Sequence, residues 1–328
     1  MMRKMLLLCL TAALLTSCAA GANESESIQP RQTQQKAQLE KLETNEQGVP
    51  VLKVYVVSDE KVERMDAETY VQGVLAGEMK NDWPLEALKA QAILARTFVL
   101  KFVQEKESRY EGADISTDIE EAQAYDATGI NDRIRRAVAE TEGMVLYSHD
   151  QLPYAWFHAH SGGMTELARA GLGWEKEEPP YTTVAQGNEP ETAQDAQALT
   201  DAQAWQARFS FEEFQAACAR QGVETPVSAA TRITVDQRGD SGRAVSIRVG
   251  EHPVQAAELR LALGSTKMRS TLLTSLKTDA DGILMAGKGY GHGVGMSQWG
   301  AYGMAQEGKS AEEIVMHYFR EVTLARAW

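Results

Sequence analysis

Residues 73–98 read GVLAGEMKNDWPLEALKAQAILARTF and carry the clearest fold signal in the chain. Asp66 is placed to cap a helix that we expect to run to about Met79. The apolar residues of this helix recur at spacings of three and four, which predicts one buried face. These residues are Val71, Val74, Leu75 and Met79.

A second helix is expected after the break at residues 80–82. Asp82 can cap this helix, Pro84 suits its first turn, and the pattern extends to about Val103. From Ala90 onward the helix is apolar nearly all round, so we predict that it is buried.

Other elements flank this pair. Residues 51–57 read as a strand, residues 131–142 as a helix, and residues 144–147 and 154–157 as two strands around a turn at His149 and Asp150.

The second half of the chain opens with a polar loop or linker at residues 185–200. A helix is expected near residues 211–220, and a hairpin pairs residues 231–235 with 244–249. A glycine-rich stretch at 287–303 and a helix near 311–319 close the chain. The mixture predicts an α+β fold of helices and antiparallel strands. We expect its core to comprise residues 49–185 and 283–328, with a smaller lobe, about 186–282, inserted between them.

The N-terminus has the pattern of a bacterial lipoprotein signal. Residues 1–17 contain Arg3 and Lys4 and then a short apolar run, and residues 15–18 read LTSC. Cleavage before Cys18 would leave this cysteine to carry lipid on the outer face of the cell membrane. The alternative is an ordinary secretory signal that contains a cysteine. Residues 18–48 are polar and predict a disordered tether.

Composition excludes several functional classes. The chain has 328 residues and a net charge of −13, and removal of residues 1–17 leaves 31 basic against 46 acidic residues, or −15. A nucleic-acid partner is therefore disfavoured. Cys9 leaves with the signal and Cys18 would be lipidated, so Cys218 has no partner for a disulfide or for a thiolate-held zinc. We expect no cofactor.

Glu78 is the first candidate for chemistry, because it lies on the flank of the apolar helical stripe. Desolvation would raise the pKa of its carboxyl and keep it protonated as a general acid. The alternative is an exposed glutamate at a helix end. Arg96, within the nearly all-apolar second helix, needs an acidic partner. If that partner is Glu78, the pKa would fall instead; otherwise Arg96 pairs with another acid.

Three ordered blocks resemble the SpoIID/LytB family. They are GVLAGEM at residues 73–79 with WPLEALKAQA and ARTF at 83–98, FHAHSGGMTE at 157–166, and GYGHGVGMSQWGA at 289–301. The resemblance spans roughly residues 50–320 and is weakest between 185 and 280. It implies a SpoIID-like catalytic domain that acts on peptidoglycan glycan strands. The family includes lytic transglycosylases and proteins described as enhancers of cell-wall amidases.

The resemblance places the catalytic glutamate at Glu78 and the substrate-binding groove around the other block residues. The expected substrate-binding residues are Trp83, Gln91, Arg96, His158, Ser161, Tyr290, His292, Ser297 and Gln298. Trp83 and Tyr290 would lie nearest the chemistry. Trp156, Trp174 and Trp299 are further candidates for stacking on sugars, with the protein core as the alternative.

One departure concerns metal. Some sporulation members have a Cys-x4-His-Cys run ahead of Gln-Ala-Tyr, whereas this chain has Ser116, Glu121 and Ala122 ahead of residues 123–125. Zinc held by thiolates is therefore not expected. A strict role in sporulation is also in doubt.

The glycine-rich block fits none of the dinucleotide, phosphate-loop or nucleophile-elbow patterns. It is a tight loop with His292 near its tip, followed by a helix that Ser297 can cap. This loop either forms a wall of the sugar groove, with His292 and Gln298 as hydrogen-bonding groups, or packs internally. His158 and His160 point to one face of a strand; they shape the groove, or less plausibly bind metal or activate Ser161.

The leading hypothesis is non-hydrolytic cleavage between N-acetylmuramic acid and N-acetylglucosamine by Glu78 alone. The main alternative is a non-catalytic glycan-binding protein that stimulates an amidase. A metal-dependent hydrolase is a third and weaker reading.

Overall fold

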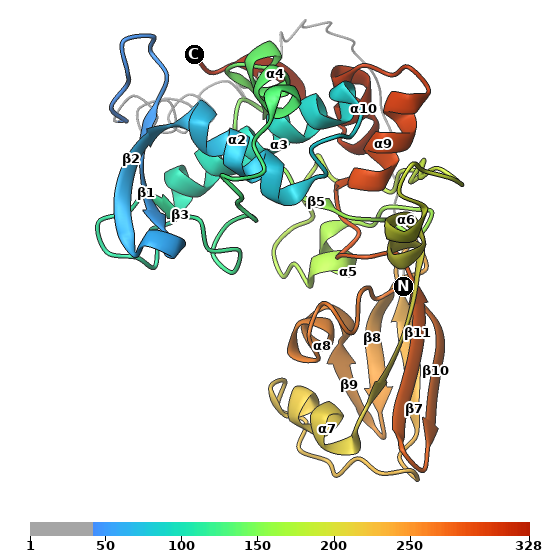
Figure 1. Cartoon of the computed structure of the whole chain (residues 1–328). Coiled ribbons are helices and arrows are strands. Elements are labelled where there is room, and N and C mark those ends of the chain that lie inside the picture. Colours follow the sequence, from blue (N-terminus) through green and yellow to red (C-terminus); the bar gives the residue numbers. More distant parts are fainter. Residues whose placement is uncertain (1–41) are drawn as a thin grey trace, which may run out of the picture.

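The computed structural model describes residues 42–328 (Figure 1). The predicted signal segment, Cys18 and most of the predicted tether lie outside the described residues. Residues 42–48 already form a turn, in which the Asn45 side chain accepts hydrogen bonds from the amides of Gln47 and Val49. Residues 42–48, which the predicted tether included, are therefore part of the folded structure.

The predicted α+β class is confirmed by helices and several small sheets. The helices are α2 (Ala67–Glu78), α3 (Leu85–Glu105), α4 (Asp132–Glu140), α5 (Ala168–Leu172), α6 (Ala196–Gln203), α7 (Phe211–Ala219), α8 (Ala256–Ala262), α9 (Gln298–Gln306) and α10 (Ala311–Tyr318), with one 3₁₀ turn, η1 (Val57–Asp59). The strands are β1 (Val51–Val56), β2 (Lys61–Asp66), β3 (Ile115–Ser116), β4 (Met144–Tyr147), β5 (Phe157–His158), β6 (Ala204–Phe209), β7 (Ile233–Arg238), β8 (Ala244–Val249), β9 (His252–Gln255), β10 (Leu273–Asp279), β11 (Gly282–Lys288), β12 (Met296–Ser297) and β13 (Thr323–Arg326). None of the helices within residues 42–328 is long and apolar enough to cross a bilayer.

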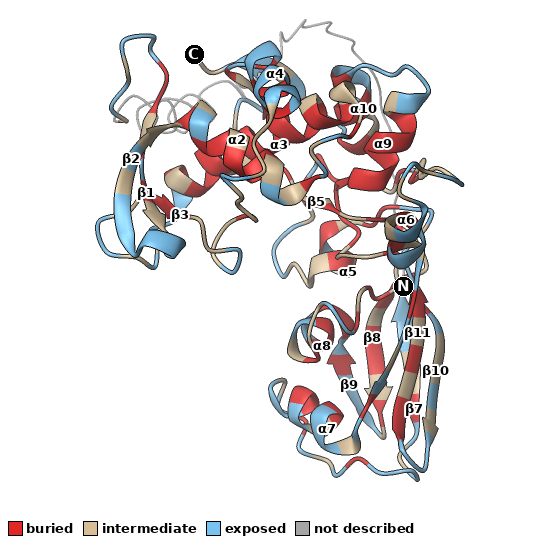
Figure 2. Ribbon diagram, viewed as in Figure 1, coloured by how far each residue is buried: buried red, intermediate tan, exposed pale blue. Residues whose placement is uncertain are grey.

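The upper body in Figure 1 is built around α3, which packs against α2, α4, α9 and α10. The cap of α2 is the predicted one, because the Asp66 side chain accepts a hydrogen bond from the Thr69 amide. The cap predicted for α3 is wrong: Pro84 occupies the N-cap position and Asp82 makes no capping bond. Figure 2 shows the buried residues gathered where these helices meet. Nearly the whole of α3 is buried, as its apolar pattern predicts.

Three small sheets complete the described part of the upper body, and one of them pairs β5 parallel with β12. β1 pairs antiparallel with β2 and parallel with β3. β4 pairs with β13 at the C-terminus, so the predicted partner strand at residues 154–157 is wrong. The aromatic side chains that suggested that strand pack on one another instead: the Tyr154 and Trp156 rings stack 5.2 Å apart and both meet the edge of Trp174.

The lower lobe in Figure 1 has its own hydrophobic core, which runs from Trp205 to Met285. One sheet has the order β10-β11-β6 and a second has the order β7-β8-β9, with α7 and α8 beside them. The predicted hairpin is the β7–β8 pair. β11 belongs to this lobe, so the chain returns to the upper body only after Lys288 rather than at residue 283.

The turn between β7 and β8 fixes the lobe to the upper body. Arg243, fully buried, donates hydrogen bonds to the carbonyl oxygens of Ser161 and Met164. Glu166 in turn accepts bonds from the amide and hydroxyl of Ser241. Gly293 lies flat against the Arg243 guanidinium, since a Cβ there would be 2.3 Å from it. The Arg243 guanidinium of the lobe therefore contacts two loops of the upper body, one at residues 161–164 and one at Gly293.

Candidate functional site

Glu78 is the last residue of α2 and lines a pocket of about 510 Å³. Its side chain is half-buried, and one carboxylate oxygen accepts a hydrogen bond of 2.7 Å from the Ala124 amide. Burial raises the pKa of Glu78, while the bonds from Ala124 and the Gln298 side chain lower it; the net shift is upward. The geometry matches the predicted desolvated acid and differs from an exposed helix end.

Residues 124–126, which include the Ala124 amide, pack closely against α2 at Gly73 and Gly77. Gly73 and Gly77 allow this approach, because a Cβ at Gly73 would be 2.2 Å from the Tyr125 ring and a Cβ at Gly77 would be 2.6 Å from the Tyr125 nitrogen. The Asp126 amide also donates to the Gly73 carbonyl at 2.9 Å. The two glycines of the GVLAGEM block thus bring a distant backbone to Glu78.

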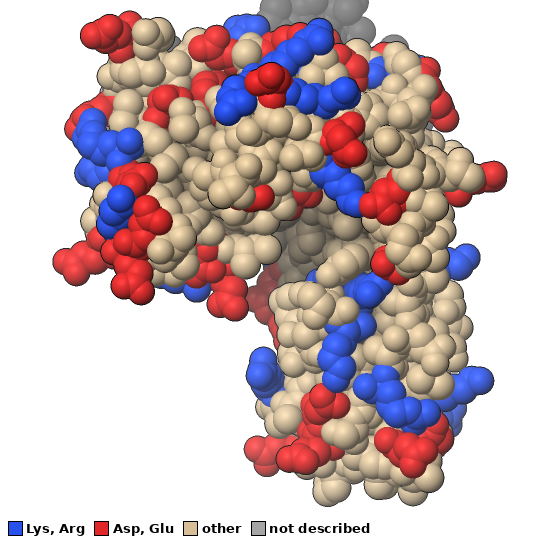
Figure 3. Space-filling model, in the orientation of Figure 1, with Lys and Arg blue, Asp and Glu red and all other residues tan. Residues whose placement is uncertain are grey.

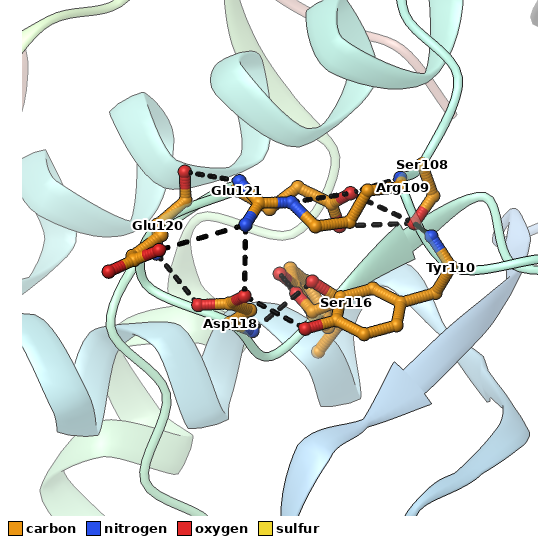
Figure 4. A network of polar contacts seen from close by, with 8 residues as sticks. Ser108, Arg109, Tyr110, Ser116, Asp118, Glu120 and Glu121 are labelled. Atoms are coloured by element: carbon orange, nitrogen blue, oxygen red, sulfur yellow. Dashed lines mark hydrogen bonds and ion pairs between the residues drawn. The ribbon is translucent and has the colours of Figure 1, made fainter.

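A polar network anchors the start of this segment (Figure 4). Glu121 accepts hydrogen bonds from the Ser108 hydroxyl and the Arg109 amide, and Asp118 accepts one of 2.8 Å from the Tyr110 hydroxyl. Asp118 and Glu121 belong to the run in which Ser116, Glu121 and Ala122 stand where some sporulation members have Cys, His and Cys. Within residues 42–328, no group of three or more His, Cys, Asp or Glu side chains is placed to hold a metal ion.

Gln298 brings the C-terminal glycine-rich block to Glu78. Its amide donates to the Glu78 main-chain carbonyl at 3.2 Å and lies 3.5 Å from the side-chain oxygen of Gln91. Residues from the first and third sequence blocks therefore meet at the end of α2.

An aromatic pocket adjoins the acid. Trp83, Trp299 and Tyr302 pack with ring centroids 4.5–5.3 Å apart and line a pocket of about 550 Å³. Lys80 and Asp82 line both this pocket and the Glu78 pocket. The two pockets are therefore neighbours. The space-filling view shows a further concave recess between the upper body and the lower lobe (Figure 3).

The predicted binding role is wrong for five residues, because their side chains are at most 4% exposed and are engaged inside the protein. They are Gln91, Arg96, His158, Ser161 and Ser297. Arg96 pairs with Glu68, not Glu78, through bonds of 3.0 and 2.5 Å. These buried groups support the loops and helices around the site and do not face a ligand.

The two histidine-containing blocks contact each other. The ring centroids of His158 and His292 lie 5.6 Å apart, and the Nδ1 atom of His158 bonds the Val294 carbonyl. Burial, reinforced by Arg260 and Arg243, lowers the pKa of His292 to about 3. Burial and the neighbouring His292 also push the pKa of His158 well down. Both rings are neutral at physiological pH, which suits packing better than proton transfer.

Tyr290 is half-buried, and its ring lies 5.4 Å from the guanidinium carbon of Arg269. Its backbone pairs with His160, so it belongs to the glycine-rich loop rather than to the Glu78 pocket. Sequence reasoning missed Glu189, whose buried carboxylate bonds Ser161 and Ser297. It also missed Ala124, since a main-chain amide carries no sequence signal.

Comparisons with known proteins found a matching family model and several relatives. The model of the stage II sporulation protein family matches residues 57–147, and a domain of unknown function matches residues 173–295. Stage II sporulation protein D of Bacillus amyloliquefaciens is 31% identical, over 84% of this chain and 78% of its own length. An uncharacterised protein of Brachyspira hyodysenteriae is also 31% identical, over 80% of this chain and 67% of its own.

The chain belongs to the SpoIID/LytB family, as its motif blocks predict. A further relative, named amidase enhancer, of Bacillus subtilis is 26% identical over 77% of this chain. That match covers only 40% of the enhancer's length. The family thus contains proteins named for sporulation and for amidase enhancement.

Proposed function

We propose that this protein is a peptidoglycan lytic transglycosylase in which Glu78 is both general acid and general base. The observation that supports this most is the half-buried Glu78 carboxyl, with its raised pKa, in a pocket that shares Lys80 and Asp82 with a neighbouring aromatic pocket. A carboxyl that stays protonated near neutral pH can give its proton to a leaving oxygen. Trp83 and Tyr302 line the neighbouring pocket, and each is 7% exposed, so only a small part of each ring is open to a sugar.

In the proposed reaction, Glu78 gives its proton to the oxygen that joins N-acetylmuramic acid to N-acetylglucosamine, and the bond from that oxygen to the muramyl C1 breaks. The Glu78 carboxylate then takes the proton of the muramyl C6 hydroxyl, whose oxygen bonds C1. The products are a 1,6-anhydro end and a free N-acetylglucosamine 4-hydroxyl. The substrate supplies the nucleophile, so the pair of carboxyls used by most glycosidases is not required.

Asp126 lines the same pocket, and the pKa of its carboxyl is shifted downward, opposite to that of Glu78. Hydrogen bonds from the Thr128 hydroxyl and amide lower the pKa of Asp126. The pocket therefore holds two carboxyls whose pKa values are shifted in opposite directions, and we propose that the Asp126 carboxylate stabilises positive charge that develops at C1.

The second candidate is a non-catalytic glycan-binding protein that stimulates an amidase. The resemblance to the protein named amidase enhancer favours it. Purified glycan strands separate the two functions, because only a catalyst releases soluble fragments without an added amidase. We expect release by the wild type, a loss of 10²–10⁴-fold in Glu78→Gln, and normal release by Glu312→Gln, a variant of an exposed glutamate on α10. Equal release by wild type and Glu78→Gln would reject the catalytic role.

We also propose that lipid on Cys18 holds the protein at the outer face of the cell membrane, near its polymer substrate. The LTSC pattern at residues 15–18 supports this anchor.

A further inference from the structure

Glu189 has a buried carboxylate in a segment that looks like a linker in the sequence. Its side chain is 7% exposed. One oxygen accepts a hydrogen bond of 2.6 Å from the Ser161 amide and one of 2.8 Å from the Ser297 hydroxyl. The Nδ1 atom of His160 lies 3.6 Å from the same oxygen. Glu189 therefore joins the loop at residues 161–163 to the glycine-rich block at residues 287–303.

The contact with Ser297 determines how α9 begins. Ser297 is the N-cap of α9, and its hydroxyl oxygen accepts a bond of 3.2 Å from the Gly300 amide. A serine hydroxyl has a single proton, and here that proton goes to Glu189. The carboxylate thus fixes the direction of the hydroxyl and the position of the cap. There is little room for rearrangement, since a Cβ at Gly187 would be 2.0 Å from the other Glu189 oxygen.

Gln298, the residue after Ser297, links the cap of α9 to Glu78. Gln298 is the first residue of α9 and donates to the Glu78 main-chain carbonyl at 3.2 Å. The contacts run from Glu189 to Ser297, along one peptide unit to Gln298, and on to Glu78. Ser161 is held from both sides, because Arg243 bonds its carbonyl while Glu189 bonds its amide.

We infer that Glu189 is a positioning residue for Glu78: it clamps the N-terminus of α9 so that Gln298 stays against the acid. This role rests on the proposed function for its catalytic consequence, but the coupling itself is a property of the folded protein. Glu189 has no part in the chemistry and makes its contacts inside the protein.

The test uses Glu189→Gln, which keeps the shape and removes the charge. The pKa of Glu78 is followed by ¹³C NMR of its carboxyl, and the pH dependence of kcat/KM is measured on glycan strands. Because the Gln298 side chain lowers the pKa of Glu78, loosening its contact should raise this pKa. The basic limb of the pH profile of kcat/KM should shift to higher pH by the same amount, and kcat should fall roughly tenfold. Glu191→Gln, an exposed change two residues away, is the matched control.

A double-variant cycle decides between positioning and a general loss of structure. Gln298→Ala should give the same upward shift, and Glu189→Gln combined with Gln298→Ala should shift no further. Ser297→Ala breaks the same link from the other side and should reproduce the shift if Glu189→Gln folds poorly. The charged side chains that line the Glu78 pocket are Lys80, Asp82 and Asp126, and these variants leave all three in place.

The inference is overturned if the variants lower activity without moving the Glu78 titration, or if the shifts of Glu189→Gln and Gln298→Ala add. Failure of the proposed function gives a different result. A protein that releases no anhydro fragments would still show the NMR shift if Glu189 positions Glu78.

Discussion

Arg96 provides a demanding test, because the structure replaces a predicted substrate contact with a buried ion pair. Arg96 is fully buried, and its Nε and Nη2 atoms bond both carboxylate oxygens of Glu68. A third nitrogen, Nη1, donates to the Met144 carbonyl at 3.0 Å, and Glu68 also accepts from the Gly143 amide. The pair therefore joins α2, α3 and the start of β4.

Arg96→Met should leave Glu68 without its cation in a mostly buried position. Breaking a buried pair from one side costs about 3–5 kcal/mol of unfolding free energy. The melting temperature should fall by roughly 10 °C for a chain of this size. Replacing both partners, as in Arg96→Met with Glu68→Met, should recover most of the loss, because no uncompensated charge remains.

The assay combines urea unfolding with activity measured well below the melting temperature. We expect kcat/KM of folded Arg96→Met to stay within about threefold of the wild type. A variant that keeps its stability but loses glycan binding would refute the assignment. It would mean that Arg96 serves the substrate, as its sequence block implies.

Three further outcomes follow from the site. Gly77→Ala should lower kcat by roughly tenfold or more, because its Cβ would meet the Tyr125 nitrogen at 2.6 Å and push the Ala124 amide away from the acid; unchanged kinetics would contradict this. Glu78→Gln should be more resistant to urea than the wild type at pH 8 and equal to it at pH 3.5. The pKa of Glu78 is raised from 4.5 by burial, so its ionisation destabilises the folded state progressively above that pH; a difference that persists at pH 3.5 would argue against this cause. Cys18→Ser should move the protein from the membrane pellet to the soluble fraction, and retention in the pellet would reject the lipid anchor.

Local pattern predicts the helices of the upper body well. Apolar spacing and the Asp66 cap define α2, and the nearly all-apolar run defines α3. The strand predicted at residues 154–157 is wrong except at Phe157, where β5 begins, because β4 takes its partner from β13 at the far end of the chain. β6 is missed because it follows α6 directly, and its partner β11 lies more than seventy residues further along the chain.

The site is harder to predict than the helices. The desolvation of Glu78 follows from its place beside the apolar stripe, but the bond from Gln298 crosses 220 residues of sequence. The pairing of Arg96 with Glu68 depends on how α2 and α3 cross, which spacing along one helix does not determine. Glu189 sits in a polar stretch without periodicity, so only the folded chain distinguishes its buried carboxylate from exposed neighbours such as Glu191.

The chemical identity of the new glycan ends tests the central proposal most directly. Purified glycan strands are digested in H₂¹⁸O, and the fragments are analysed by mass spectrometry. Intramolecular attack by the C6 hydroxyl predicts 1,6-anhydromuramyl ends that contain no ¹⁸O, and their absence with Glu78→Gln. Muramyl reducing ends that carry ¹⁸O from the first turnover would show that water is the nucleophile and would contradict cleavage by Glu78 acting alone.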